Sequence, residues 1–175
     1  MSAHIFLQGP RNIGKSTVIT KTLDILNAHR AIILGGFFTW NGGHGDPHVY
    51  MRPALPEPEG ERYRLASYDT DKGGLICDIQ AFEKSGAELL KRSRNADLII
   101  MDELGFLEND AAEFKRAVLD IISGDIPVLG VLRLGDVPWH KDIKSNPRVT
   151  IFEVNEKNRD TLPRELAALL MRTGH

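Results

Sequence analysis

Short apolar runs rich in Ile, Val and Leu recur along the chain and alternate with segments of helical periodicity. This alternation is typical of a parallel sheet covered by helices on both faces. The sequence predicts five strands, at residues 5–7, 31–34, 98–101, 128–132 and 149–154. The predicted fold class is therefore three-layer α/β, with a mainly parallel five-stranded core sheet between two layers of helices.

Four segments place apolar residues three and four positions apart, which predicts helices with one buried face. They lie at residues 18–26, 82–90, 110–122 and 163–170. Asp110 and Glu113 have the spacing of a capping box at the start of the third helix, and Gly124 follows its end.

Residues 39–74 interrupt this pattern with several glycines, four prolines and the polar run PEPEGER at 56–62. Two short strand-like pieces, HVYM and RYRLAS, flank that polar run. The segment is interpreted as a β-hairpin insertion. Since no repeat or linker-length low-complexity tract occurs, residues 1–175 are interpreted as a single domain.

The composition narrows the possible partners and compartment. With 22 Lys and Arg against 24 Asp and Glu, the formal charge of −2 gives no strong nucleic-acid signal, although the sum would hide a local basic patch. The single Cys77 has no partner for an intramolecular disulfide, and no apolar run reaches transmembrane length. These features favour a cytoplasmic protein without membrane association, and they leave any protein partner unknown.

Residues 9–16, GPRNIGKS, fit the pattern G-x-x-x-x-G-K-[ST] between a predicted strand and a predicted helix, which is the context of a P-loop. In that motif, backbone N–H groups and the helix N-terminus bind phosphate. Lys15 would reach the β and γ phosphates, Ser16 would bind Mg²⁺, and Thr17 would contact the α phosphate. The alternative is a chance glycine-rich turn. The predicted phosphate-binding residues are Gly9, Pro10, Arg11, Asn12, Ile13, Gly14, Lys15, Ser16 and Thr17.

The run LIIMDE at 98–103 is an apolar strand that ends in two carboxylates, like the second motif of P-loop proteins. Asp102 would support Mg²⁺ through its water shell, and Glu103 would orient and deprotonate a water molecule. The alternative interpretation is that both carboxylates only end a strand at the surface.

Ligands bind such sheets at the carboxyl ends of the strands, so residues that follow other strands are further candidates. Arg133 follows the strand at 128–132 and is either a cation for the γ phosphate or an ordinary surface arginine. Asn158 and Arg159 lie between the last strand and the last helix, where they either flank the base or cap the helix. Trp40 and Trp139 are either packing residues or stacking surfaces.

The chain resembles the nucleoside-triphosphatase family typified by small thermophilic NTPases and the human cancer-related nucleoside-triphosphatase. The resemblance rests on HIFLQGPRNIGKSTV, GFFT, DIQAFEKSGAELL, ADLIIMDELGFLE, PVLGVLRLGD and VTIFEVNEKNRDTLP, in the family's order along nearly the whole chain. It implies an additional-strand P-loop fold with an antiparallel hairpin and slow hydrolysis of several NTPs, and sometimes NDPs, with Mg²⁺.

The resemblance also carries a nucleotide-contacting segment onto Leu98, Ile99, Ile100, Met101, Asp102, Glu103, Leu104 and Gly105. One segment departs from the family pattern. After the second strand the family has charged E-x-R and R-x-G-F stretches, whereas here residues 38–41, FTWN, lead into GGHGDPHVYMR. This departure bears on substrate preference.

The predicted function is Mg²⁺-dependent hydrolysis of ATP, GTP and other nucleoside triphosphates to the diphosphate and phosphate, with broad base specificity. Glu103, Lys15 and Arg133 are the predicted catalytic residues, and Ser16 and Asp102 the metal-binding ones. Two alternatives stay open, a small-molecule or nucleotide kinase and a nucleotide-dependent switch protein.

Overall fold

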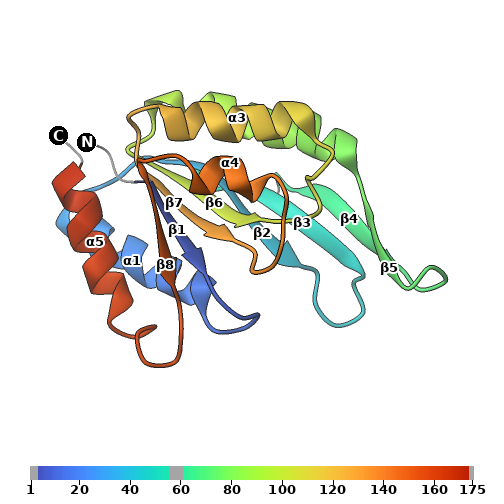
Figure 1. Cartoon of the computed structure of the whole chain (residues 1–175), viewed down its shortest axis with the longest axis horizontal. Helices are drawn as coiled ribbons and strands as arrows, with labels where there is room; N and C mark the ends of the chain where they lie inside the picture. The colour runs from blue at the N-terminus through green and yellow to red at the C-terminus, as the bar shows by residue number, and fades with distance from the viewer. Residues whose placement is uncertain (1–3, 56–60, 174–175) are drawn as a thin grey trace.

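The computed structural model describes residues 4–55 and 61–173 and has three layers, with helices on both faces of one sheet (Figure 1). The sheet has eight strands in the order β5-β4-β3-β2-β6-β7-β1-β8. Their bounds are β1 His4–Gln8, β2 Leu34–Asn41, β3 His48–Pro53, β4 Tyr63–Asp69, β5 Gly74–Cys77, β6 Leu98–Leu104, β7 Val128–Leu132 and β8 Val149–Glu153.

The helices lie in the four segments predicted to be helical, and one further short helix, α4, is present. They are α1 Lys15–His29, α2 Ala87–Lys91, α3 Ala112–Ser123, α4 His140–Lys144 and α5 Leu162–Thr173. A π-helical segment, Ala81–Gly86, precedes α2, and a 3-10 turn, Arg92–Asn95, follows it. The short α4 is absent from the sequence prediction, since five residues are too few for a clear periodicity.

The α/β class is confirmed, but the prediction of a five-stranded sheet is wrong. Parallel pairing joins β2, β6, β7, β1 and β8. The segment interpreted as a hairpin insertion contributes three further strands, β3, β4 and β5, which continue the same sheet by antiparallel pairing from β2. The sheet is therefore mixed, and residues 56–60 of the polar run lie outside the described residues.

The second strand is also displaced from its predicted position at 31–34, because β2 runs from Leu34 to Asn41. Gly35 and Gly36 interrupt the apolar pattern of this strand, which makes it hard to recognise from the sequence. Both glycines are nevertheless required by close packing. A Cβ on Gly35 would meet the side-chain oxygen of Ser93 at 2.7 Å, and one on Gly36 would overlap the carbonyl of Ile100 in β6. Gly36 also has a φ of 83°, which favours glycine.

The predicted capping box at Asp110 and Glu113 is wrong as well, since α3 begins at Ala112 without a local side-chain cap. Glu83, from the π-helical segment Ala81–Gly86, caps the helix instead. Its Oε2 accepts hydrogen bonds from the backbone N–H groups of Glu113, at 2.7 Å, and Phe114, at 3.3 Å. A carboxylate at a helix N-terminus also stabilises the helix dipole. The predicted end of α3, at Ser123 before Gly124, is confirmed.

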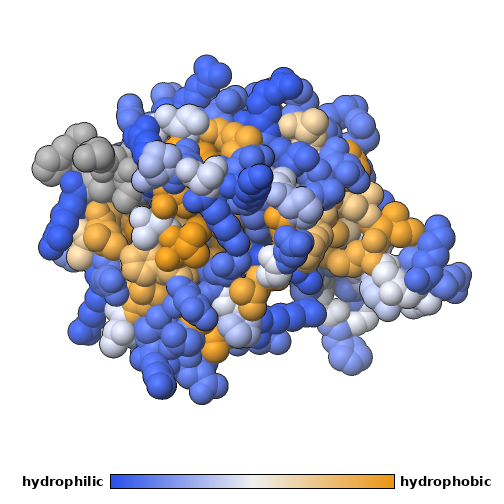
Figure 2. All heavy atoms as spheres, viewed as in Figure 1, coloured by the Kyte–Doolittle hydropathy of each residue, from blue (hydrophilic) through white to orange (hydrophobic). Residues whose placement is uncertain are grey.

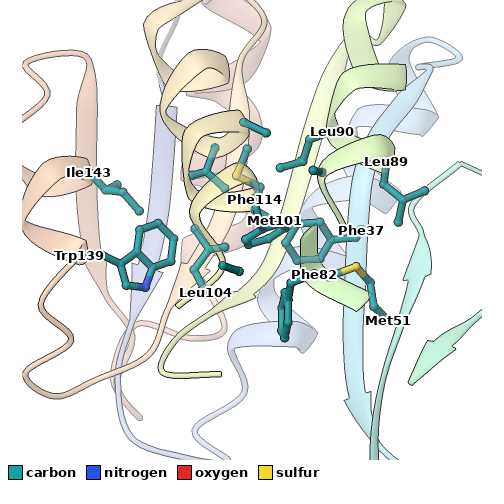
Figure 3. Close-up of a cluster of buried hydrophobic side chains, with 14 of the residues drawn as sticks. Phe37, Met51, Phe82, Leu89, Leu90, Met101, Leu104, Phe114, Trp139 and Ile143 are labelled. Carbon is teal, nitrogen blue, oxygen red and sulfur yellow. The ribbon is translucent and has the colours of Figure 1, made fainter. Parts of the chain in front are cut away.

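Two hydrophobic clusters fill the spaces on either side of the sheet. One lies under α1 and α5 and includes Leu23 and Leu166, and the other lies under α2 and α3. Phe114 is central to the second cluster (Figure 3), with its ring 5.7 Å from that of Phe37 and 5.3 Å from that of Phe82. This cluster fixes α3 on β2 and β6, the strands whose carboxyl ends enter the site described below.

We predict that Phe114→Ala lowers the free energy of unfolding by about 3–5 kcal/mol, because it leaves a cavity beside the rings of Phe37 and Phe82. Leu75→Ala is the matched control. Leu75 is 46% exposed, at the β5 end of the sheet where Figure 2 shows apolar surface, so its removal creates no internal cavity. Urea unfolding measures both, and equal losses in the two variants would contradict the central role of Phe114.

Candidate functional site

The loop between β1 and α1 lies at the carboxyl edge of the sheet, where the site residues meet. Gly9 packs directly on the chain after β8, since an added Cβ would lie 2.6 Å from the carbonyl oxygen of Val154. Gly14 precedes α1 with a φ of 109°, a conformation that favours glycine. The two glycines of the motif are therefore required by the backbone path, and that path places the N-terminus of α1 at the sheet edge.

Lys15 folds back over this loop. Its Nζ donates hydrogen bonds to the carbonyl oxygens of Gly9 and Pro10, each at 2.8 Å. Burial lowers the pKa of Lys15, and the carboxylates of Glu103 and Asp102 oppose that shift. The ammonium group is thus held above the loop by carbonyl oxygens that an anionic ligand can replace.

Asp102 joins this loop to β6. Ser16 Oγ donates a hydrogen bond to Asp102 Oδ2 at 3.2 Å. Asp102 is only 5% exposed, and burial raises its pKa to about 6 against the opposing effect of the Ser16 hydrogen bond. Within the described residues, no group of three His, Cys, Asp or Glu side chains is placed to hold a metal ion by itself. A cation here would need ligands beyond the protein carboxylates.

Glu103 and Arg133 lie beside each other at the same edge. Arg133 Nη1 is 3.9 Å from Glu103 Oε1, and the side chain of Glu103 is 35% exposed. The backbone of Glu103 is held by β2, because its N–H donates to Thr39 Oγ1 at 3.0 Å. Arg133 is held by its own N–H, which donates to the carbonyl of Leu104 at 2.8 Å, and by Phe106, whose ring centroid is 5.4 Å from the guanidinium carbon.

Glu108 is a site residue that the sequence analysis did not single out. It is 2% exposed, and its Oε1 accepts a short hydrogen bond from the N–H of Gly105, while Trp139 Nε1 donates to the Gly105 carbonyl at 3.0 Å. Burial raises the pKa of Glu108 to about 7. Both sides of the Gly105 backbone are therefore fixed just after Glu103. Trp139 is thus a packing residue, one of its two predicted roles.

Asn158 and Arg159 are brought toward the loop by the turn after β8. Arg159 Nη1 donates to the Ile13 carbonyl at 3.4 Å, so this arginine reaches the Gly9–Ser16 segment. Asn158 is used within its own turn, where its Nδ2 donates to the Glu153 carbonyl at 2.7 Å and its Oδ1 accepts from Asn155 N–H at 2.9 Å. Its side chain does not cap α5.

The remaining predicted site residues fall into an exposed group and a buried group. Exposed positions that a ligand can reach are Pro10, Arg11, Asn12, Ser16 and Thr17. Fully buried side chains are those of Leu98, Ile99, Ile100, Met101 and Leu104. These buried residues pack in the two hydrophobic clusters, and so they position Asp102 and Glu103 without presenting side-chain surface to a ligand. Among the described helices, none is long and apolar enough to cross a membrane.

Comparisons with known proteins identify relatives of this chain. The chain is 30% identical to the nucleoside-triphosphatase THEP1 of Thermotoga maritima, over 95% of this chain and 94% of that protein. It is 26% identical to the human cancer-related nucleoside-triphosphatase, with 93% of each protein covered.

Two solved structures share the fold. The crystal structure of THEP1 from Aquifex aeolicus matches with a TM-score of 0.78 at 24% identity, over 95% of this chain and 98% of that one. The solution structure of the human cancer-related nucleoside triphosphatase matches with a TM-score of 0.76 at 22% identity, over 98% of each. The family model described as NTPase matches residues 4–167, and the chain therefore belongs to this NTPase family.

Proposed function

We propose that this protein is a P-loop enzyme that hydrolyses nucleoside triphosphates, with Mg²⁺, to the diphosphate and phosphate. The observation that carries the proposal is the Ser16–Asp102 hydrogen bond, because it joins the lysine-bearing loop to the strand that ends in Glu103. The names of the curated relatives, nucleoside-triphosphatases in bacteria and in mammals, support the same reaction. Broad base specificity and a cytoplasmic location complete the proposal.

The oxygen atoms of Ser16 and Asp102 fit a magnesium ion. Mg²⁺ prefers hard oxygen ligands, keeps several waters, and takes its other ligands from substrate phosphates. The hydroxyl of Ser16 and the buried carboxylate of Asp102 are 3.2 Å apart, and none of the ion pairs among the described residues involves Asp102. When bound here, Mg²⁺ would neutralise charge on the β and γ phosphate oxygens.

Lys15 would bind the β and γ phosphates in place of the carbonyls of Gly9 and Pro10. The N-terminus of α1 adds N–H donors for phosphate oxygens. Neither group takes part in a covalent step, so both act by binding and by stabilising negative charge.

Glu103 is the proposed general base. A water molecule attacks the γ phosphorus, Glu103 accepts its proton, and the bond from the γ phosphorus to the bridging oxygen breaks, which releases the diphosphate. Arg133 lies beside Glu103, where its guanidinium would stabilise charge on the transferring phosphoryl group. Arg159, which reaches the Ile13 carbonyl of the loop, would flank the base of the nucleotide.

A panel of ribo- and deoxynucleoside tri- and diphosphates, assayed with Mg²⁺ for phosphate release and for product by chromatography, tests the proposal. Phosphate release in the absence of any acceptor or partner is the expected result. A kinase would instead transfer phosphate to an added acceptor with little release alone, and a switch protein would need its partner for turnover.

We predict that Glu103→Gln lowers kcat by about 100-fold or more while nucleotide still binds, since the change removes the base and keeps the size of the side chain. Lys15→Ala is the contrasting variant. It removes the loop's ammonium group, so both affinity and turnover should fall. Steady-state kinetics with equilibrium binding measures both, and an unchanged kcat in Glu103→Gln would assign water activation to another residue.

We predict that Arg133→Ala lowers kcat about 10-fold or more with little change in triphosphate affinity, because the guanidinium acts on charge that develops during transfer. Arg11→Ala is the matched arginine control within the loop and should act mainly on binding. The same kinetic and binding measurements distinguish them. A wild-type kcat in Arg133→Ala would leave its contact with Glu103 as an ordinary surface ion pair.

A further inference from the structure

Aromatic and arginine side chains lie together on another part of the sheet, at the strands whose sequence departs from the family pattern. Trp40 in β2 pairs directly with Tyr50 in β3, and their rings stack with centroids 5.4 Å apart and planes 25° apart. The guanidinium carbon of Arg62, just before β4, lies 5.0 Å from the Tyr50 ring centroid. We call these three residues the Trp40–Tyr50–Arg62 row.

A hollow of about 550 Å³ lies over one end of the row, lined by residues that include His48, Tyr50, Arg62 and Arg64. Both arginines are exposed, and neither forms an ion pair within the described part of the chain. One nearby carboxylate, that of Asp46, already accepts hydrogen bonds from Tyr50 Oη and from His48 N–H, each at 3.0 Å. Asp78 also lines the hollow. Arg52 is exposed on the same face, with its guanidinium carbon 4.8 Å from the Phe38 ring centroid, so this surface carries three arginines against two aspartates.

The row begins beside the candidate phosphate site. Phe38 is the register partner of Asp102 in β6, and Trp40 lies two residues further along β2, so both rings point to the face that carries Asp102. Thr39, between them, accepts the hydrogen bond from Glu103 N–H at 3.0 Å. A ligand that extends along the row therefore starts next to Glu103 and continues away from α1 toward β4.

The chemistry of this surface fits a chain of unpaired nucleotides. Aromatic rings stack with any base, and arginines bind the linking phosphates, which is how proteins hold single strands without reading their sequence. A mononucleotide site is usually a concave, mostly apolar pocket, whereas this surface crosses three strands, with Arg52 beside Phe38 at one end and Arg62 and Arg64 at the other. We propose that the Trp40–Tyr50–Arg62 row binds single-stranded nucleic acid.

The test is fluorescence anisotropy with a labelled dT₁₂ oligonucleotide and the full chain at low salt. Wild-type protein should bind, and Tyr50→Leu should weaken binding at least about fivefold, the lower range for loss of one stacked base. Arg62→Ala, an exposed substitution that should not disturb folding, should lower the slope of log Kd against log salt by about 0.7. Arg116→Ala, an exposed arginine on α3 that pairs with Glu113, is the matched control and should bind as the wild type.

Two further binding measurements distinguish this site from the nucleotide site. Lys15→Ala should keep its affinity for dT₁₂, so the outcome does not depend on the proposed hydrolysis, and loss of binding in that variant would place the strand in the loop instead. Unlabelled dTMP should compete far more weakly than dT₁₂. No binding to dT₁₂, equal binding by Tyr50→Leu and the wild type, or equal competition by dTMP would overturn the proposal.

Discussion

The hydrogen bond between Ser16 and Asp102 is the contact on which the site depends, because it joins two segments 86 residues apart in the chain. It exists because β6 and β1 both pair with β7 in parallel, so that their carboxyl ends lie at one edge of the sheet. The packing of α3 against β2 and β6 and of α1 against the opposite face holds that edge in place. The hydrophobic clusters thus set the distance between the loop and the carboxylate.

Burial of charge at this edge has an electrostatic consequence. The pKa of Asp102 is raised to about 6 and that of Glu108 to about 7, since both carboxyl groups are almost completely removed from water. Asp102 faces the loop, where a cation would favour its charged form, whereas Glu108 is turned toward the Gly105 backbone. Two buried carboxyl groups only six residues apart therefore have different roles, one toward a ligand and one toward the protein.

Much of the site was predictable because its signals are local in sequence. GPRNIGKS determines a backbone path that requires Gly9 and Gly14, and the apolar strand before Asp102 identifies the second segment. Contacts between distant segments were not predictable. Glu83 caps α3 from 30 residues away, and Trp139 holds the Gly105 carbonyl from 34 residues away, yet neither contact has a sequence spacing that marks it. The two predicted hairpin pieces correspond to β3 and β4, but β5 and the pairing of β3 with β2 were missed, since edge pairing depends on register across the sheet.

The most direct measurement is phosphate release as a function of Mg²⁺ concentration for the wild type and Asp102→Asn. If Ser16 and Asp102 form the cation position, the variant should need about 10-fold to 100-fold more Mg²⁺ for half-maximal rate, as is typical when a residue that orients metal ligands is changed. Binding of nucleotide without Mg²⁺ should be no weaker in the variant. Identical Mg²⁺ curves for the two proteins would contradict the assignment of Asp102 and place the cation elsewhere.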